Sequence, residues 1–261
     1  MEEKNSGNQS LIRGLRLMEI LSNYPNGCPL AKLTEISGLN KSTTHRLLQG
    51  LHNEGYVKPS NTTGSYRLTT KCLSLGQKTL ASLNIINLAA PYLEKLNLAL
   101  GETVNFSKRE DNHGIMVYKL EPTTGMMQTR AYIGQQFQLY CSAMGKLFLA
   151  YETNTSYLEH YWKNHPDIIQ PLTCNTITDI DTMRRELAQV KLEQFAMDRE
   201  ENELGVVCVA SPIFNLNGKV EYAASISTSI HRLEQLGIET ILTELKGMTQ
   251  SISHELGWAG H

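Results

Sequence analysis

Apolar residues recur at helical spacing in two stretches near the start of the chain, and helix-stopping residues follow each stretch. The first stretch ends at Tyr24-Pro25-Asn26-Gly27, and the second begins beside Pro29 and ends at Gly38. This spacing predicts two amphipathic helices with one apolar face each. We expect the buried faces to carry Leu11, Leu15, Met18 and Leu21, flanked by Leu17 and Ile20, in the first helix and Leu30, Leu33 and Ile36 in the second.

A third helix is predicted after the turn Gly38-Leu39, from Asn40 to about Asn53. Asn40 is a favourable N-cap, because its side chain accepts a hydrogen bond from a backbone N–H of the first turn. The inward face is expected to carry Thr44, Leu47, Leu48 and Leu51, which follow the i, i+3, i+4 and i+7 spacing. The outward face then carries Ser42, His45, Arg46 and Gln49, flanked by Lys41.

Two short strands are predicted after Gly55, at 56–58 and 65–68, around a turn at 61–64. Three helices followed by such a hairpin are typical of a winged helix-turn-helix. A connecting helix is predicted over 70–83, and a further helix begins at Pro91 and ends at Gly101. Both carry leucine stripes of the kind that often packs against a second copy of a chain.

After Thr103 the pattern changes to short strands and separated helices. Strands are predicted at 104–106, 115–118, 129–132, 206–213 and 222–227, and helices at 143–151, 155–164, 180–192 and 232–256. This order predicts an α+β domain built on an antiparallel sheet. The expected organisation is a disordered tail at 1–10, a winged helix-turn-helix domain at 11–70, a linker helix at 71–86 and a second domain at 87–258.

The bulk composition narrows the class of protein. At 261 residues with 41% hydrophobic content, the chain is expected to be globular. Its apolar runs are far shorter than the roughly 20 residues of a transmembrane helix, and its first residues lack the pattern of a signal peptide. We therefore expect a cytoplasmic protein with no membrane partner. The five cysteines are scattered and form no CxxC pair, which indicates reduced thiols rather than disulfides or a metal site.

The charge is unevenly distributed along the chain. Residues 1–70 hold eight Lys and Arg against five Glu, a net charge of +3, whereas the remaining 16 cations and 21 anions sum to −5. A positive module on an acidic body suits a polyanionic partner, because neutralising phosphates and releasing their counterions dominates nucleic-acid affinity. An excess of this size is also within ordinary surface variation.

Double-stranded DNA is the partner that the third helix and the hairpin together indicate. The major groove admits an α-helix, and short polar and cationic side chains suit base edges and phosphates. Arg46 is the candidate for a guanine contact, and His45 and Gln49 are candidate base readers. The candidate phosphate contacts are Lys41, Ser42 and Thr43 on the first turn of the helix and Lys58 and Arg67 on the hairpin. The alternative is a solvated helix face in a protein-binding module.

The motifs of both halves resemble those of IclR-type bacterial transcriptional regulators. In the first half these are PLAKLTEISGLNKSTTHRLLQGLHNEGYV and YRLTTKCLSLG, and in the second GETVNFS, YCSAMGK, MDREENELGVVCVASPIF and AASIS. The resemblance covers nearly the whole chain beyond the tail. It implies a GAF/profilin-like effector-binding domain at 87–258, a homodimer or dimer of dimers, and a palindromic operator in the nucleoid.

The resemblance also implies a pocket for a small organic acid. The positions that match the family's pocket are Ala143, Met144, Asp198, Cys208, Ser225 and Ser227. Ser142-Ala143-Met144 begins a predicted helix, whose N-terminal amides suit a carboxylate. Ser225 and Ser227 are two residues apart on a predicted strand, so their side chains point to the same face of the sheet. Met144 stands where many family members have a small residue, which alters the pocket's volume. Each position also has a structural alternative: serines that bond backbone carbonyls, a core cysteine, or a paired or surface aspartate.

No enzyme signature is present: the sequence lacks GxSxG, P-loop, GxGxxG and HExxH motifs, and no catalytic residue, cofactor or metal is expected. Our leading hypothesis is a regulator, with a repressor favoured, of a carbohydrate-acid catabolic operon that responds to a keto or sugar acid. The alternatives are a small-molecule sensor whose first domain binds a protein and, less favoured, an enzyme acting on a sugar acid.

Overall fold

The computed structural model describes residues 8–60, 64–81, 84–122, 129–164 and 166–260. The chain divides into two compact units, 1–82 and 83–261. The predicted tail at 1–10 falls mostly on residues 1–7, which lie outside the described residues, and Gln9 and Ser10 already belong to the first helix. The predicted turn at 61–64 likewise falls mostly outside them.

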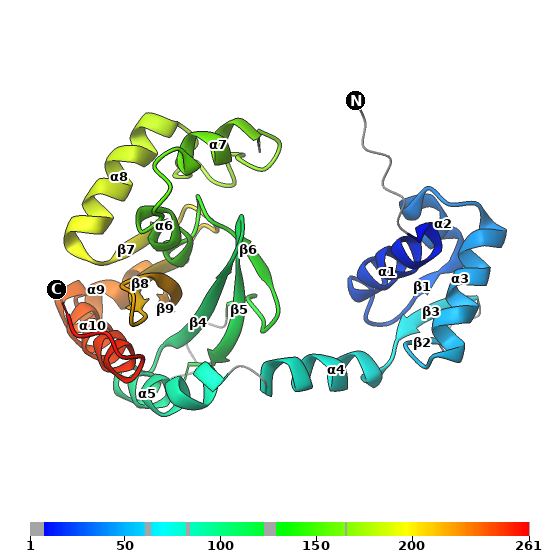
Figure 1. The fold of residues 1–261 in the computed structure, drawn as a ribbon, viewed down its shortest axis with the longest axis horizontal. Coiled ribbons are helices and arrows are strands. Elements are labelled where there is room, and N and C mark those ends of the chain that lie inside the picture. Colours follow the sequence, from blue (N-terminus) through cyan, green and yellow to red (C-terminus); the bar gives the residue numbers. More distant parts are fainter. Residues whose placement is uncertain (1–7, 61–63, 82–83, 123–128, 165, 261) are drawn as a thin grey trace. The chain divides into compact units, whose positions relative to one another are not determined.

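The first unit is a helical bundle with a small three-stranded sheet (Figure 1). Its helices are α1 (Gln9–Ser22), α2 (Leu30–Ser37), α3 (Lys41–Asn53) and α4 (Thr70–Ala81), and its strands are β1 (Cys28–Pro29), β2 (Val57–Pro59) and β3 (Ser65–Leu68). The strands pair antiparallel in the order β1-β3-β2. The core consists of Leu17, Leu21, Cys28, Leu33, Leu48 and Val57. This arrangement confirms the predicted winged helix-turn-helix.

Local sequence explains where α3 begins. Gly38 adopts a positive φ of 67°, which a residue without a Cβ accepts readily, and this ends α2. Asn40 then caps α3, because its Oδ1 accepts from the Thr43 amide at 2.8 Å. Thr44 and Leu48 point into the core, so the predicted inward face is confirmed.

Two predicted buried faces in this unit are confirmed only in part: Leu21 and Leu33 are buried as expected, but other predicted positions are exposed. In α1 the core side carries Gly14, Leu17 and Leu21, whereas Leu11 and Leu15 are 60% and 51% exposed. In α2 the residue buried beside Leu33 is Ser37, and Ile36 is exposed. A helix with leucines around most of its circumference does not by itself specify which stripe meets its neighbours.

The second unit is built on a six-stranded antiparallel sheet with the order β6-β5-β4-β9-β8-β7. The strands are β4 (Thr103–Glu110), β5 (His113–Leu120), β6 (Gln136–Gln138), β7 (Ala196–Arg199), β8 (Val207–Phe214) and β9 (Val220–Thr228). The predicted α+β class and antiparallel sheet are therefore confirmed.

Helices cover both faces of this sheet (Figure 1). One face is covered by α5 (Asn84–Leu100) and α10 (Ile238–Glu255), and the other by α6 (Ala143–Ala150), beyond which lie α7 (Tyr157–Asn164) and α8 (Ile180–Glu193). A short helix, α9 (Ile230–Leu236), links β9 to α10. Since both faces are covered, the side chains of β4 that alternate between them are buried over 103–107.

Several predicted boundaries in this unit are corrected. The segment 129–132 is not a strand, because the carbonyls of Thr129 and Ala131 accept from the Lys119 ammonium instead of from a neighbouring strand. The helix predicted at 232–256 is two helices, separated by Gly237 with a φ of 77°. The helix predicted from Pro91 begins at Asn84 and contains that proline. Strands β6 and β7 were not predicted, since each is an edge strand of three or four residues.

Candidate DNA-binding surface and ligand cavity

The outward face of α3 presents cationic and polar side chains. Lys41, Ser42, His45, Arg46 and Gln49 are all exposed, and Thr43 is half-buried. Ser42 donates to Asn40 Oδ1 and Gln49 donates to Asn53 Oδ1, so both are held against their own helix. Within the described part of the chain, Lys41, His45 and Arg46 have no hydrogen-bond or ion-pair partner from their side chains. These three are therefore the side chains most available to an external ligand.

The hairpin brings the two other predicted DNA contacts together. Lys58 on β2 lies directly opposite Arg67 on β3 in the antiparallel register. Directly opposite side chains share a face of a sheet, and like charges there are mutually unfavourable. Arg67 is half-buried, and its Nε has no hydrogen-bond partner among the described residues. A nearby phosphate would relieve both the repulsion and this missing bond.

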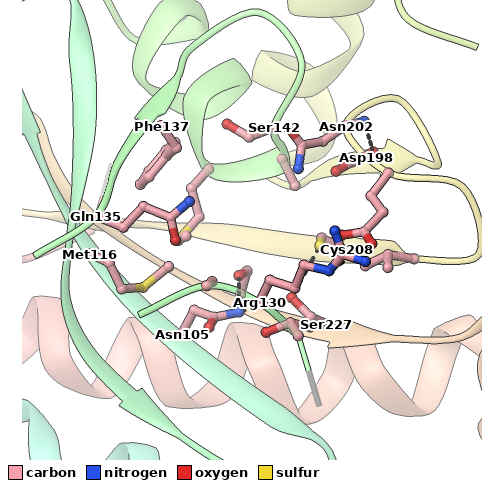
Figure 2. A pocket seen from close by; sticks show the side chains of 17 residues that line it. Asn105, Met116, Arg130, Gln135, Phe137, Ser142, Asp198, Asn202, Cys208 and Ser227 are labelled. Atoms are coloured by element: carbon pink, nitrogen blue, oxygen red, sulfur yellow. Dashed lines mark hydrogen bonds and ion pairs between the residues drawn. The ribbon is translucent and has the colours of Figure 1, made fainter. Parts of the chain in front are cut away.

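The six predicted pocket residues line one cavity of about 290 Å³ in the second unit (Figure 2). Ser225 and Ser227 come from β9, Cys208 from β8, Asp198 from β7, and Ala143 and Met144 from the start of α6. The cavity thus lies between the sheet face that α6 covers and the N-terminus of α6. Segments far apart in sequence meet here because β7, β8 and β9 are adjacent in the sheet.

Asn105 on β4 organises the floor of the cavity and was missed by the sequence reasoning. Its Nδ2 donates to Ser227 Oγ at 2.8 Å and to Ser225 Oγ at 3.3 Å. Both serines thus point to the same side of β9, as their spacing predicted. A signal was available in the sequence: Thr103, Asn105 and Ser107 alternate with Val104 and Phe106, which marks one polar face on a strand with two buried faces.

Cys208 forms part of the same floor. Its Sγ lies 3.1 Å from Ser227 Oγ. Burial, assisted by the negative charge of Asp198, raises the pKa of the Cys208 thiol to about 12. The side chain is therefore a neutral thiol at physiological pH, and a neutral thiol is a weak nucleophile. It supplies a small polarizable wall.

Asp198 lines the cavity and also braces a loop. Its Oδ1 accepts from the Glu201 amide at 2.7 Å and the Asn202 amide at 3.4 Å. Burial raises the pKa of Asp198 to about 7, since desolvation outweighs the stabilising amides and the Lys146 charge. The alternative of an aspartate paired with its neighbours thus holds for one oxygen, and the residue is not a surface charge.

The N-terminus of α6 contributes backbone donors to the cavity. Ser142 caps the helix by accepting from the Gly145 amide at 3.2 Å through Oγ and from the Lys146 amide at 3.0 Å through its carbonyl. Among the described residues nothing accepts from the amides of Ala143 and Met144. Unpaired amides at a helix N-terminus attract anions, so these two suit a carboxylate. Met144 Sδ accepts from Ser107 Oγ at 3.1 Å, which turns its side chain toward the sheet.

Arg130 is the cation that the sequence reasoning overlooked at the cavity. Its side chain is 91% exposed and pairs loosely with Glu203, at 3.8 Å from Nε to Oε1. Figure 2 shows it among the lining side chains, near Ser227 and Cys208. It was missed because the segment 129–132 was interpreted as a strand.

Among the described residues, no helix combines the length and apolar character needed to span a bilayer. The same residues contain no group of three or more His, Cys, Asp or Glu side chains arranged to hold a metal ion.

Known proteins are similar to nearly the whole chain. The model of the IclR helix-turn-helix domain matches residues 10–60, and the model of the bacterial transcriptional regulator IclR C-terminal domain matches residues 77–254. An uncharacterized HTH-type transcriptional regulator of Haemophilus influenzae is 64% identical over 98% of this chain and 96% of its own length. The DNA-binding transcriptional repressor YiaJ of Escherichia coli is 60% identical over 98% of this chain and 91% of its own length. The crystal structure of the transcriptional regulator YaiJ is 57% identical in sequence and has a TM-score of 0.66 to this structure. The match spans 67% of this chain and 96% of the YaiJ chain.

Proposed function

The chain belongs to the IclR family of bacterial transcriptional regulators, which are DNA-binding proteins and not enzymes, and we propose the following function for it as a repressor. It represses a carbohydrate-acid catabolic operon in the cytoplasm, and its affinity for the operator falls when a small organic or sugar acid binds in the cavity. The convergence of all six family positions on one cavity carries this proposal.

The DNA half of the proposal rests on α3 and the hairpin. Lys41, His45 and Arg46 are exposed and have no side-chain partner among the described residues, and the pair Lys58 and Arg67 lies in the same unit. We place α3 in the major groove and the hairpin beside the phosphate backbone. In a homodimer or dimer of dimers, two copies of α3 would read the half-sites of a palindromic operator.

The effector half rests on the chemistry of the cavity. The amides of Ala143 and Met144, which have no acceptor among the described residues, and the guanidinium of Arg130 suit a carboxylate. The Ser225 and Ser227 hydroxyls suit further oxygens of the ligand. An acid that binds one domain arrangement better than the other shifts the equilibrium by that difference in affinity. The linker helices would pass this shift to the spacing of the two α3 helices.

Fluorescence anisotropy with a labelled palindromic fragment from upstream of the target operon tests the proposal. We expect specific binding that weakens as salt rises, and weakens further at fixed salt when an effective acid is added. A thermal-shift screen of keto and sugar acids identifies such acids, because a ligand stabilises the folded state according to its occupancy. Absence of salt-sensitive DNA binding would refute the DNA half, and absence of stabilisation by any acid would refute the effector half.

A further inference from the structure

The ammonium of Lys119 on β5 has all of its hydrogens engaged. Its Nζ donates to the carbonyls of Thr129 and Ala131 at 3.1 and 2.9 Å, and to Glu121 Oε1 at 2.7 Å. An ammonium has three hydrogens, so these three acceptors use them all. The Lys119 side chain is only 6% exposed. This cation therefore has no donor left for a ligand, and its hydrogen bonds hold the segment 129–131.

Lys119 lies on the face of the sheet that forms the cavity. It is directly opposite Asn105 of β4 in the antiparallel register, and directly opposite side chains share a face of a sheet. Asn105 lines the cavity, and so do Thr129, Arg130 and Ala131 (Figure 2). The Lys119 ammonium thus supports one wall of the cavity through its hydrogen bonds to two backbone carbonyls of that wall.

The loop after β7 forms another wall of the cavity and is held by several groups. Asp198 Oδ1 accepts from the amides of Glu201 and Asn202, and Thr176 Oγ1 donates to the Glu201 carbonyl at 2.6 Å. In the segment 129–131, by contrast, the hydrogen bonds that the described residues make to the backbone all come from Lys119. Removal of this one ammonium should therefore free the segment and leave the loop in place.

Arg130 depends on the backbone of this segment for its position. Its side chain is 91% exposed, and its ion pair with Glu203 is long, at 3.8 Å. An exposed ion pair of this kind contributes little and holds a long side chain poorly. The guanidinium therefore lies at the cavity because the hydrogen bonds to Thr129 and Ala131, on either side of it, hold its backbone there.

We propose that Lys119 is a positioning residue for acid binding. It holds the segment 129–131 so that the Arg130 guanidinium meets the carboxylate of the ligand at the cavity. The inference rests on the proposed acid-binding function and assigns part of that function to a residue whose own ammonium is saturated. Without the Lys119 hydrogen bonds, binding would have to order the segment as well as the Arg130 side chain, and this ordering cost would weaken the affinity.

Trypsin cleavage after Arg130 in the full-length protein tests the support without any ligand. Fragments are identified by mass spectrometry after short digestions. Lys119→Met keeps the aliphatic side chain but removes the ammonium. It should raise the rate of cleavage after Arg130 about tenfold to a hundredfold, the range that loss of hydrogen bonds to a charged group predicts. Lys119→Arg keeps a cation with several donors and should restore most of the protection.

Lys108→Met is the matched control. Lys108 also pairs with a glutamate two residues further along its strand, Glu110, at 3.4 Å. Its side chain makes no hydrogen bond to the segment 129–131 among the described residues. Lys108→Met should therefore leave the rate of cleavage after Arg130 unchanged. Circular dichroism verifies that each variant is folded.

Calorimetric dissociation constants for gluconate, 2-ketogluconate and pyruvate test the effect on binding. Lys119→Met should weaken each acid that the wild type binds by about threefold to tenfold, the range for the cost of ordering one long side chain. Lys108→Met should leave these constants unchanged. A double-mutant cycle separates positioning from direct attraction: in an Arg130→Ala background, Lys119→Met should change the dissociation constant by less than about twofold.

The outcomes separate this inference from the proposed function. Unchanged cleavage after Arg130 in Lys119→Met would overturn the inference, whichever acids bind. A loss of affinity that keeps its full size in the Arg130→Ala background would also overturn it, because the ammonium would then attract the acid directly. In both cases the acid site itself would stand. If the wild type binds no acid, the acid-binding function fails and the role of Lys119 in binding fails with it.

Discussion

The ammonium of Lys146 on α6 lies 2.5 Å from the carboxylate of Glu201 in the loop after β7, and the two side chains are 0% and 3% exposed. Lys146 Nζ also donates to the Met197 carbonyl at 2.9 Å and pairs with Glu186 of α8 at 3.2 Å. This ammonium therefore ties α6 to the strand and loop that carry Asp198. The start of α6 and Asp198 both line the cavity, so this ion pair connects two walls of the cavity.

Lys146→Met should destabilise the second unit by about 3–5 kcal/mol, because it leaves the Glu201 carboxylate buried without its counter-ion. Urea unfolding followed by tryptophan fluorescence measures this, since both tryptophans, Trp162 and Trp258, lie in that unit. The double variant Lys146→Met/Glu201→Gln should recover part of the loss. Lys163→Met, on the exposed surface of α7, is the matched control and should change the free energy of unfolding by less than about 0.5 kcal/mol. A Lys146→Met effect as small as this control would contradict the role assigned to the ammonium.

Asp198 should make stability and acid binding depend on pH. Its folded-state pKa of about 7 lies above the ordinary value of 3.8, so the folded chain binds the proton more tightly than the unfolded chain. The Asp198 contribution is thus fully present below about pH 4 and is lost as the pH rises through 7, with a slope of at most about 1.4 kcal/mol per pH unit. Asp198→Asn should remove this dependence, so the stability of the variant relative to wild type should increase between pH 5 and pH 8.

The affinity for an acid should depend on the protonation of Asp198, because the ionised side chain repels the carboxylate of the ligand. We expect the affinity for an acid effector to fall as the pH rises through about 7, and Asp198→Asn to flatten that profile. Calorimetric titrations between pH 5.5 and 8.5 provide the measurement. Parallel profiles for the wild type and Asp198→Asn would show that another group controls the dependence.

Arg46→Ala should weaken operator binding by about 1–3 kcal/mol, the cost of losing one specific base contact, without affecting folding, because its side chain is exposed. The salt slope distinguishes its partner: loss of a phosphate contact lowers the slope by about one, whereas loss of a base contact leaves it nearly unchanged. Lys163→Ala removes the same charge from the second unit and should leave operator affinity unchanged. Wild-type affinity in Arg46→Ala would remove this residue from the interface.

Two helical glycines in the second unit should respond oppositely to alanine. A Cβ on Gly145 would overlap the Leu139 backbone. Gly145→Ala should therefore push α6 away from the segment at Leu139 and destabilise the unit by about 1–3 kcal/mol. A Cβ on Gly247 of α10 meets no atom within 4 Å, and Gly247→Ala should stabilise the unit by about 0.5–1 kcal/mol through helix propensity. Urea unfolding followed by tryptophan fluorescence measures the free energy of unfolding of both variants. A stabilising Gly145→Ala would contradict the predicted overlap with the Leu139 backbone.

Features that depend on neighbours along the chain were predictable. The cap at Asn40, the left-handed turn at Gly38 and the inward Thr44 and Leu48 follow from side-chain chemistry within a few residues. The family motifs identified the six cavity positions, and the structure brings them together. Where a local pattern was ambiguous, as in the leucine-rich α1 or the short edge strand β7, the prediction failed, because packing against a distant partner decides between faces of similar apolarity.

The sequence by itself therefore determined the winged helix-turn-helix, the α+β class of the second unit and the family, since each of these is encoded in periodicity, caps and contiguous motifs. Only the tertiary structure decided what the cavity offers a ligand. Asn105 meets Ser225 and Ser227 through the register of β4 against β9, and Lys146 meets Glu201 across 55 residues. Hydrogen bonds between residues this far apart depend on strand order and helix placement, which arise from the packing of the whole unit. The alternation around Asn105 marks a polar strand face, but it does not say which strand lies beside that face.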